Sequence, residues 1–112
     1  MYSQREQISM KSKLESIEAQ LNYIKVQINE IDAYLRVENK KNDQLIEEQF
    51  EKLNLTNCEI ERANINFYYN PLHEAFCSSV CLKQAEKKKL IEEQKKLFQQ
   101  QEHIQDALSS HN

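Results

Sequence analysis

The first third of the chain carries an unbroken heptad pattern. Its apolar residues are spaced alternately four and three apart, and they are Met10, Leu14, Ile17, Leu21, Ile24, Ile28, Ile31 and Leu35. An apolar repeat that averages 3.5 residues is typical of a coiled-coil seam. Because so narrow a stripe cannot close a globular core, it predicts a long helix that packs against another helix, in this chain or in a different one.

The predicted first helix begins near Ser3 or Ser9, because either side chain can cap it, and it runs at least to Val37. Residues 39–43 are wholly polar and interrupt the apolar spacing. The spacing then resumes, which indicates a second stretch of seam entered through an eleven-residue stutter. The residues of this second stretch are Ile46, Phe50, Leu53, Ile60 and Phe67.

The place where the chain turns back is open between three positions: near Lys41, within residues 54–57, or at Pro71. Proline disfavours helical geometry in the residue before it and is well tolerated in the first turn of a helix. We therefore expect Asn70 to cap a final helix that starts at Pro71 and ends near Leu108.

The final helix has a weaker seam, made of Leu90, Leu97 and Ile104 with glutamines between them. Together these patterns predict an all-α fold, a long antiparallel coiled-coil helical hairpin, as one elongated domain over residues 1–112 with a frayed tail at 109–112. The alternative is an elongated three-helix arrangement broken near Lys41 and Pro71. A lone two-helix hairpin buries little surface, so we also expect a dimer or a larger partner.

Composition agrees with this class. The 112 residues include no Gly, one Pro and no Trp. Without Gly, tight β-hairpin turns, phosphate-cradling loops and the strained nucleophile turn of hydrolases are hard to build. The formal net charge of −3 gives no electrostatic reason to expect nucleic acid as a partner. No apolar run approaches the roughly 18–20 residues of a membrane span, and the N-terminus does not resemble a secretory signal.

The cysteines and histidines offer the only candidate chemistry. His73, Cys77 and Cys81 are spaced four apart and would form a ladder on one helix face, which suggests zinc ligands. However, Cys58 is the only further thiol and no second short-spaced pair is present. We therefore favour cysteines that pack as small hydrophobic residues, with no metal, cofactor or catalytic residue. Three cysteines, an odd number, indicate reduced thiols in the cytoplasm.

A cluster of bulky aromatic residues precedes the final helix. Phe67, Tyr68 and Tyr69 are consecutive, so their rings point in three directions around any helix and cannot all enter one seam. We expect part of the cluster to be buried at the end of the hairpin. The remainder is a candidate partner patch, since exposed aromatic groups mark protein-binding sites. The residues of this patch are Phe67, Tyr68, Tyr69 and Phe76.

The chain length, the absence of Gly, the Gln/Lys/Glu-rich helices and the hairpin pattern resemble the FliJ/YscO/SpaM group of coiled-coil proteins in type III secretion. The resemblance implies a non-enzymatic cytoplasmic stalk that engages the hexameric secretion ATPase and the export-gate protein. It also implies handling of chaperones or secreted substrates, and a need for the protein in presenting invasion antigens. The group has no short motif to place on numbered residues. The alternative is a secretion chaperone or a heterodimeric coiled-coil scaffold for another helical protein.

Overall fold

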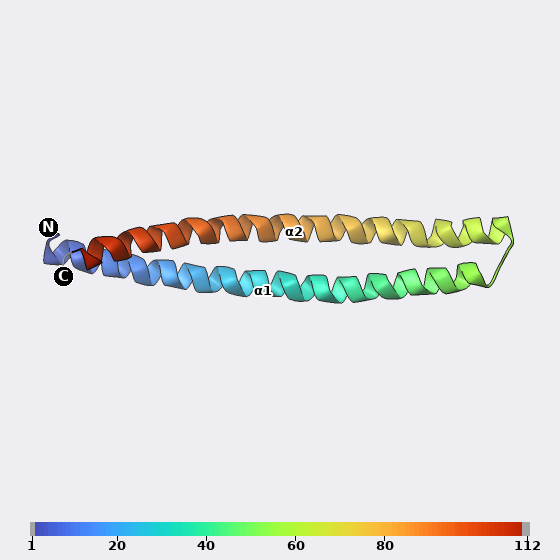
Figure 1. Ribbon diagram of the computed structural model, residues 1–112, viewed down its shortest axis with the longest axis horizontal. Coiled ribbons are helices and arrows are strands. Elements are labelled where there is room, and N and C mark those ends of the chain that lie inside the picture. The colour runs from blue at the N-terminus through green and yellow to red at the C-terminus, as the bar shows by residue number, and fades with distance from the viewer. Residues whose placement is uncertain (1, 111–112) are drawn as a thin grey trace. The chain divides into compact units, whose positions relative to one another are not determined.

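The computed structural model of the protein describes residues 2–110 and is all-helical over that range. Helix α1 spans Gln4–Asn54 and helix α2 spans Glu59–Ser109, each with 51 residues (Figure 1). The predicted all-α hairpin is confirmed. The alternative with three helices is wrong, because α1 continues through residues 39–43 and α2 continues through Pro71.

The contacts within the chain divide it into two units. The turn unit comprises residues 31–86, in which the end of α1 and the start of α2 run antiparallel on either side of the turn (Figure 1). The terminal unit comprises residues 2–30 and 87–110, in which the start of α1 and the end of α2 also run antiparallel (Figure 1).

Hydrogen bonds of nearby serine side chains account for the start of α1 and the end of α2. Ser3 caps α1, because its Oγ accepts a hydrogen bond of 3.1 Å from the backbone N–H of Glu6. At the other end, Ser109 closes α2 and donates from its Oγ to the carbonyl of Gln105 at 2.8 Å. Of the predicted frayed tail, Ser110 still bonds back to the carbonyl of Asp106 at 3.0 Å. Residues 111–112 lie outside the described residues.

The turn consists of residues 55–58, which overlap the second of the three predicted positions, residues 54–57. No described residue adopts positive φ, so the turn forms without glycine. Arg62 holds it closed from α2, since its Nη1 donates to the carbonyls of Leu53 and Thr56. Thr56 in turn accepts the backbone N–H of Cys58 at 3.2 Å. These bonds satisfy carbonyls and an N–H that the helix ends leave without a helical partner.

The expectation that Pro71 begins a helix is wrong, because it lies inside α2. Proline in a helix interior removes one backbone hydrogen bond and costs about 3 kcal/mol. Two neighbours on α2 explain why the helix persists: Tyr69 is buried against α1, and His73 bonds to α1 side chains. Pro71 itself is exposed, so water can reach the carbonyl that it leaves unpaired. Packing therefore overrides the local preference.

The seam of the terminal unit contains the most deeply buried part of α1. Ile17, Leu21 and Ile24 are all less than 9% exposed. Facing residues on α2 are half-buried, so each helix pair buries one stripe and no thick core. Of the predicted seam residues, Ile31 is the remaining buried one, and the half-buried ones are Met10, Leu14, Ile28, Leu35, Leu90, Leu97 and Ile104.

The predicted second stretch of seam is wrong in its residues. Ile46, Phe50, Ile60 and Phe67 are 49%, 64%, 73% and 82% exposed, and Leu53 alone of that set is half-buried. The heptad repeat of α1 instead continues without a stutter, and polar side chains occupy several of its positions. The half-buried residues that continue the repeat are Glu38, Asn42, Leu45 and Gln49.

Candidate protein-binding surfaces

A polar cluster occupies the seam of the turn unit. His73 on α2 lies between two amides of α1, with Nδ1 3.0 Å from Asn42 Oδ1 and Nε2 2.7 Å from Gln49 Oε1. Gln49 extends the cluster by donating from Nε2 to Asn66 Oδ1 at 2.9 Å. Because these side chains satisfy one another, the seam can hold polar groups without an unpaired donor or acceptor.

The cluster constrains where the protons of His73 lie. Gln49 uses its Nε2 on Asn66, so its Oε1 faces His73 and the ring Nε2 must donate. The ring Nδ1 faces the Asn42 amide, and a half-turn of that amide exchanges its oxygen for its nitrogen, so Nδ1 can donate or accept according to the orientation of the amide. His73 thus bonds to two amides of α1 in the seam.

Tyr69 is the anchor of the turn unit and is only 1% exposed. Its ring meets Tyr68 edge to face, with 5.0 Å between centroids and an interplanar angle of 84°. Its hydroxyl donates to Glu48 Oε2 at 3.4 Å, and the Lys52 ammonium lies 5.3 Å from its ring centroid. Lys52 also has a hydrogen bond and a charge interaction with Tyr69, and these raise the pKa of Lys52 above its ordinary value of 10.5.

The predicted aromatic patch does not form one surface. Tyr69 is buried, Phe76 is half-buried in the seam, and Phe67 and Tyr68 are 82% and 64% exposed. Phe67, Tyr68 and Tyr69 are consecutive, so the helix directs their rings to different sides, whereas Phe76 lies seven residues after Tyr69 on the side that faces the seam. Binding of a partner by Phe67 and Tyr68 stays a prediction, whereas Tyr69 and Phe76 contribute to the packing of the hairpin.

The predicted ladder of His73, Cys77 and Cys81 is also divided. His73 points into the seam, whereas Cys77 and Cys81 are exposed and free, as is Cys58 in the turn. The expectation that the cysteines pack as small hydrophobic residues is therefore wrong. Among residues 2–110, no group of three His, Cys, Asp or Glu side chains is placed to hold a metal ion.

One flank of the turn unit is identified by contacts between the helices. Tyr34 Oη lies 2.6 Å from Ser79 Oγ. Lys41 of α1 and Leu72 of α2 line a surface groove of about 240 Å³ together with Ser79. The heptad repeat of α2 in the turn unit consists of Tyr69, His73, Phe76 and Val80, which are all buried or half-buried. Tyr34, Lys41, Leu72 and Ser79 each stand one place before a position of the repeat. Residues that stand one place after such a position therefore lie on the opposite flank.

The opposite flank, which we name the turn flank, carries a cluster of apolar residues that are exposed except for the half-buried Leu53. Its members all stand one place after a position of the repeat, and they are Ile46, Phe50 and Leu53 on α1 and Ile60 and Phe67 on α2. These residues are regularly spaced along the chain, but their spacing marks an outer stripe on each helix. The two stripes belong to one side of the turn unit.

The two aromatic rings of the turn flank lie at the same level along the hairpin. Gln49 and Asn66 are joined by a hydrogen bond of 2.9 Å across the seam. Phe50 follows Gln49, and Phe67 follows Asn66. The rings are 64% and 82% exposed, so the turn flank presents one aromatic ring from each helix to solvent. Exposed apolar clusters of this kind are typical of protein-binding sites.

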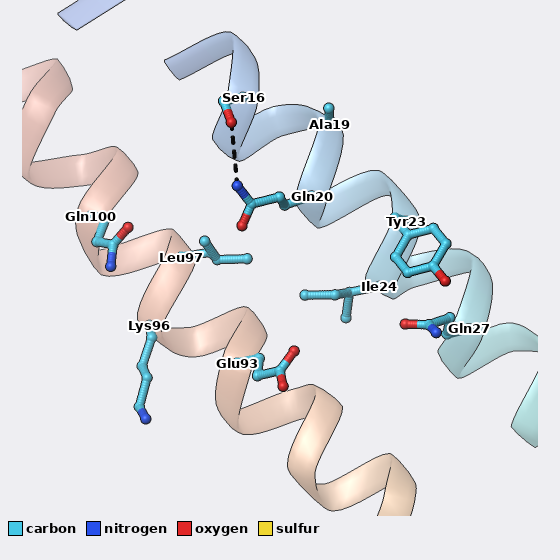
Figure 2. A pocket seen from close by; sticks show the side chains of 10 residues that line it. All are labelled: Ser16, Ala19, Gln20, Tyr23, Ile24, Gln27, Glu93, Lys96, Leu97 and Gln100. Atoms are coloured by element: carbon cyan, nitrogen blue, oxygen red, sulfur yellow. Dashed lines mark hydrogen bonds between the residues drawn. The ribbon is translucent and has the colours of Figure 1, made fainter. Parts of the chain in front are cut away.

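A second surface feature lies in the terminal unit. A groove of about 610 Å³ runs between α1 and α2, with Ile24 and Leu97 pointing toward one another across it (Figure 2). Gln20 and Gln100 lie toward one end of the groove, and Gln20 is held by a hydrogen bond of 3.3 Å to Ser16 (Figure 2). The groove gives the seam here a partly open, mixed apolar and amide surface.

Comparison with known protein families, curated proteins and solved structures finds no match to this chain. Neither helix of the described chain is long and apolar enough to cross a membrane.

Proposed function

We propose that this chain is a non-enzymatic coiled-coil adaptor that binds other proteins through its turn unit. The observation that carries the proposal is the turn flank, where Phe50, Ile60 and Phe67 are each more than 60% exposed. Single exposed apolar residues are common, but a cluster on one side of a two-helix unit indicates a covered surface. Antiparallel helices with little buried core suit a role in which a partner supplies the missing contacts.

The finer proposal is a stalk of a type III secretion apparatus that engages the hexameric ATPase and the export-gate protein at its cytoplasmic face. Its support is the resemblance to the FliJ/YscO/SpaM group together with the heptad seams of α1 and α2. A helix pair without a long internal loop can present one end to a partner while the other end stays free. The proposed role is accessory, so the chain would affect the turnover of the ATPase and the export of invasion antigens without catalysing a reaction.

Co-purification tests this proposal directly. The tagged full chain is incubated with the purified secretion ATPase, and both complex formation and ATP turnover are measured. We expect a complex and a changed turnover with the wild-type chain, and loss of both when Phe50 and Phe67 are replaced by serine. A matched control is Phe98→Ser, because Phe98 is also exposed but lies in the terminal unit. Absence of any complex with the wild-type chain argues against the stalk.

The polar seam favours a second candidate, a secretion chaperone or heterodimeric scaffold. Asn42, Gln49, Asn66 and His73 replace apolar contacts with hydrogen bonds in the turn unit. A seam with fewer apolar contacts opens at lower cost and can exchange one helix for another. Titration with a secreted substrate distinguishes the two roles. A gain in helical circular dichroism beyond the sum of the components, without ATPase binding, favours the chaperone.

A further inference from the structure

The charge around the turn flank identifies the kind of partner that fits it. Residues 43–74 carry seven carboxylates and two cationic side chains, a formal net charge of −5 with His73 neutral. All seven carboxylates are exposed, and they belong to Asp43, Glu47, Glu48, Glu51, Glu59, Glu61 and Glu74. Asp43 and Glu74 stand one place after a position of the repeat and share the turn flank with the apolar cluster, whereas Glu48, Glu51 and Glu61 stand one place before such a position and lie on the opposite flank. The turn flank is therefore acidic.

The two cationic side chains of this segment are directed toward the protein itself. Lys52 lies over the Tyr69 ring, and Arg62 donates to the carbonyls of Leu53 and Thr56. The surface ion pairs Lys41–Glu38 and Lys83–Glu86 use carboxylates outside this segment. The Lys52 ammonium also interacts with the Glu48 carboxylate, but neither Lys52 nor Arg62 stands on the turn flank beside Asp43 and Glu74.

We propose that the turn flank binds a basic amphipathic helix of another protein, with an apolar stripe seated on Phe50 and Phe67 and lysine or arginine on its edges. The geometry favours a helix, because Ile46, Phe50 and Leu53 form a stripe that an i, i+3, i+4, i+7 pattern can match. The carboxylates of Asp43 and Glu74 on this flank attract cationic side chains and disfavour acidic ones. This inference deepens the proposed function and rests on it for the existence of a protein partner.

A second copy of the chain fits this surface less well. Two turn units packed symmetrically through the turn flank would bring Asp43 and Glu74 of both copies into one interface, because a two-fold interface uses the same patch on both partners. Like charges at such short distances repel one another, which weakens binding and disfavours that pairing. The partner is therefore a chain with the opposite charge around its apolar stripe.

Two synthetic peptides test whether the turn flank prefers a basic helix to an acidic one. Each has about 18 residues, enough for five helical turns, and the same leucine stripe, with lysine on its edges in one peptide and glutamate in the other. Binding to the full-length chain is measured by fluorescence anisotropy. We expect the lysine peptide to bind at least about tenfold more tightly than the glutamate peptide. This preference should weaken between about 0.1 M and about 1 M salt, as the Debye length falls from about 10 Å to about 3 Å.

Variants of the chain test the location. Phe50→Ser combined with Phe67→Ser removes both exposed rings and should weaken binding of the lysine peptide by about tenfold or more. Phe98→Ser is the control, with a ring that is 50% exposed in the terminal unit, and should leave binding unchanged. Far-UV circular dichroism establishes that all variants remain helical. Equal loss in Phe98→Ser, equal binding of the two peptides, or no binding at about 1 mM overturns the proposal.

Sedimentation velocity tests the alternative occupant of the turn flank, which is a second copy of this chain. A dimer of the full chain that disappears in the Phe50→Ser, Phe67→Ser variant would overturn the proposal in favour of a second copy. A monomer that binds the lysine peptide supports it. Failure to bind the secretion ATPase, with peptide binding intact, refutes the stalk and leaves this inference standing. Binding of the ATPase that ignores both phenylalanines refutes this inference alone.

Discussion

The contrast between two adjacent tyrosines gives the sharpest test of the packing. Tyr69 is 1% exposed in the seam of the turn unit, and Tyr68 is 64% exposed. Tyr69→Ala should therefore destabilise the protein strongly, whereas Tyr68→Ala should have a small effect. The two substitutions delete the same atoms from neighbouring positions of one helix. They change helix propensity equally, so the difference in the free energy of unfolding reports burial.

The magnitude follows from the buried area. A tyrosine side chain buries roughly 150–250 Å², and at about 25 cal/mol per Å² this corresponds to about 4–6 kcal/mol as an upper estimate. Measured replacements of buried aromatic residues by alanine cost about 3–5 kcal/mol. We expect about 3–5 kcal/mol for Tyr69→Ala and less than about 1.5 kcal/mol for Tyr68→Ala. Tyr69→Phe should cost less than about 1 kcal/mol, because the bond from Tyr69 to Glu48 is long at 3.4 Å.

Urea denaturation followed by circular dichroism at 222 nm measures these differences. The dependence of the free energy on urea must be the same in all variants for the values to be compared. If Tyr69→Ala does not fold, Tyr69→Leu keeps an apolar side chain and should retain an intermediate stability. The reasoning is refuted if the alanine variants of Tyr69 and Tyr68 differ by less than about 1 kcal/mol, which is within the spread of surface substitutions.

Three further predictions concern other parts of the hairpin. Ile24→Asp should cost several kcal/mol or abolish helicity, because it buries an unpaired charge at a position that is 5% exposed, whereas Val26→Asp at 54% exposed should be nearly neutral in the same melts. Pro71→Ala should raise stability by about 1–3 kcal/mol by restoring a backbone hydrogen bond, and a lower urea midpoint would contradict this. The pKa of Lys52 is raised by Tyr69, so its contribution to stability is fully present below pH 10.5 and is lost as the pH rises through the folded pKa. Melts of wild type and Lys52→Met from about pH 9 to about pH 12 should converge at the alkaline end, and a constant difference would argue against this interaction.

The sequence predicted the class of fold because apolar spacing in α1 is regular and unambiguous. It misplaced the seam of the turn unit because the true positions there hold polar side chains. Asn42 and Gln49 carry no apolar signal, whereas Ile46 and Phe50 do, so a search for apolar spacing selects the outer stripe. Only the pairing of Asn42 with His73 across the seam reveals the correct phase.

The sequence did not predict that α2 continues through Pro71, and it did not predict the candidate surface, for related reasons. Pro71 is a strong local signal for a helix start, but the contacts of Tyr69 and His73 with α1 outweigh it. The aromatic cluster was visible in the sequence. Which ring enters the seam depends on the phase of the heptad repeat. The sequence of residues 66–80 alone does not determine this phase, because it also depends on the contacts of these residues with α1. Phe50 was missed as a surface residue because its spacing suggested the interior.

The polar cluster also has a consequence for how the two helices of the turn unit are aligned. A purely apolar heptad seam looks the same after one helix slides by seven residues, about 10 Å. Sliding in one direction would bring His73 level with Leu35, and sliding in the other would bring Asn42 level with Val80. Each displaced polar group would then lose its partner, at about 1–3 kcal/mol. The residues that weaken this seam are thus the ones that make a single alignment the most stable.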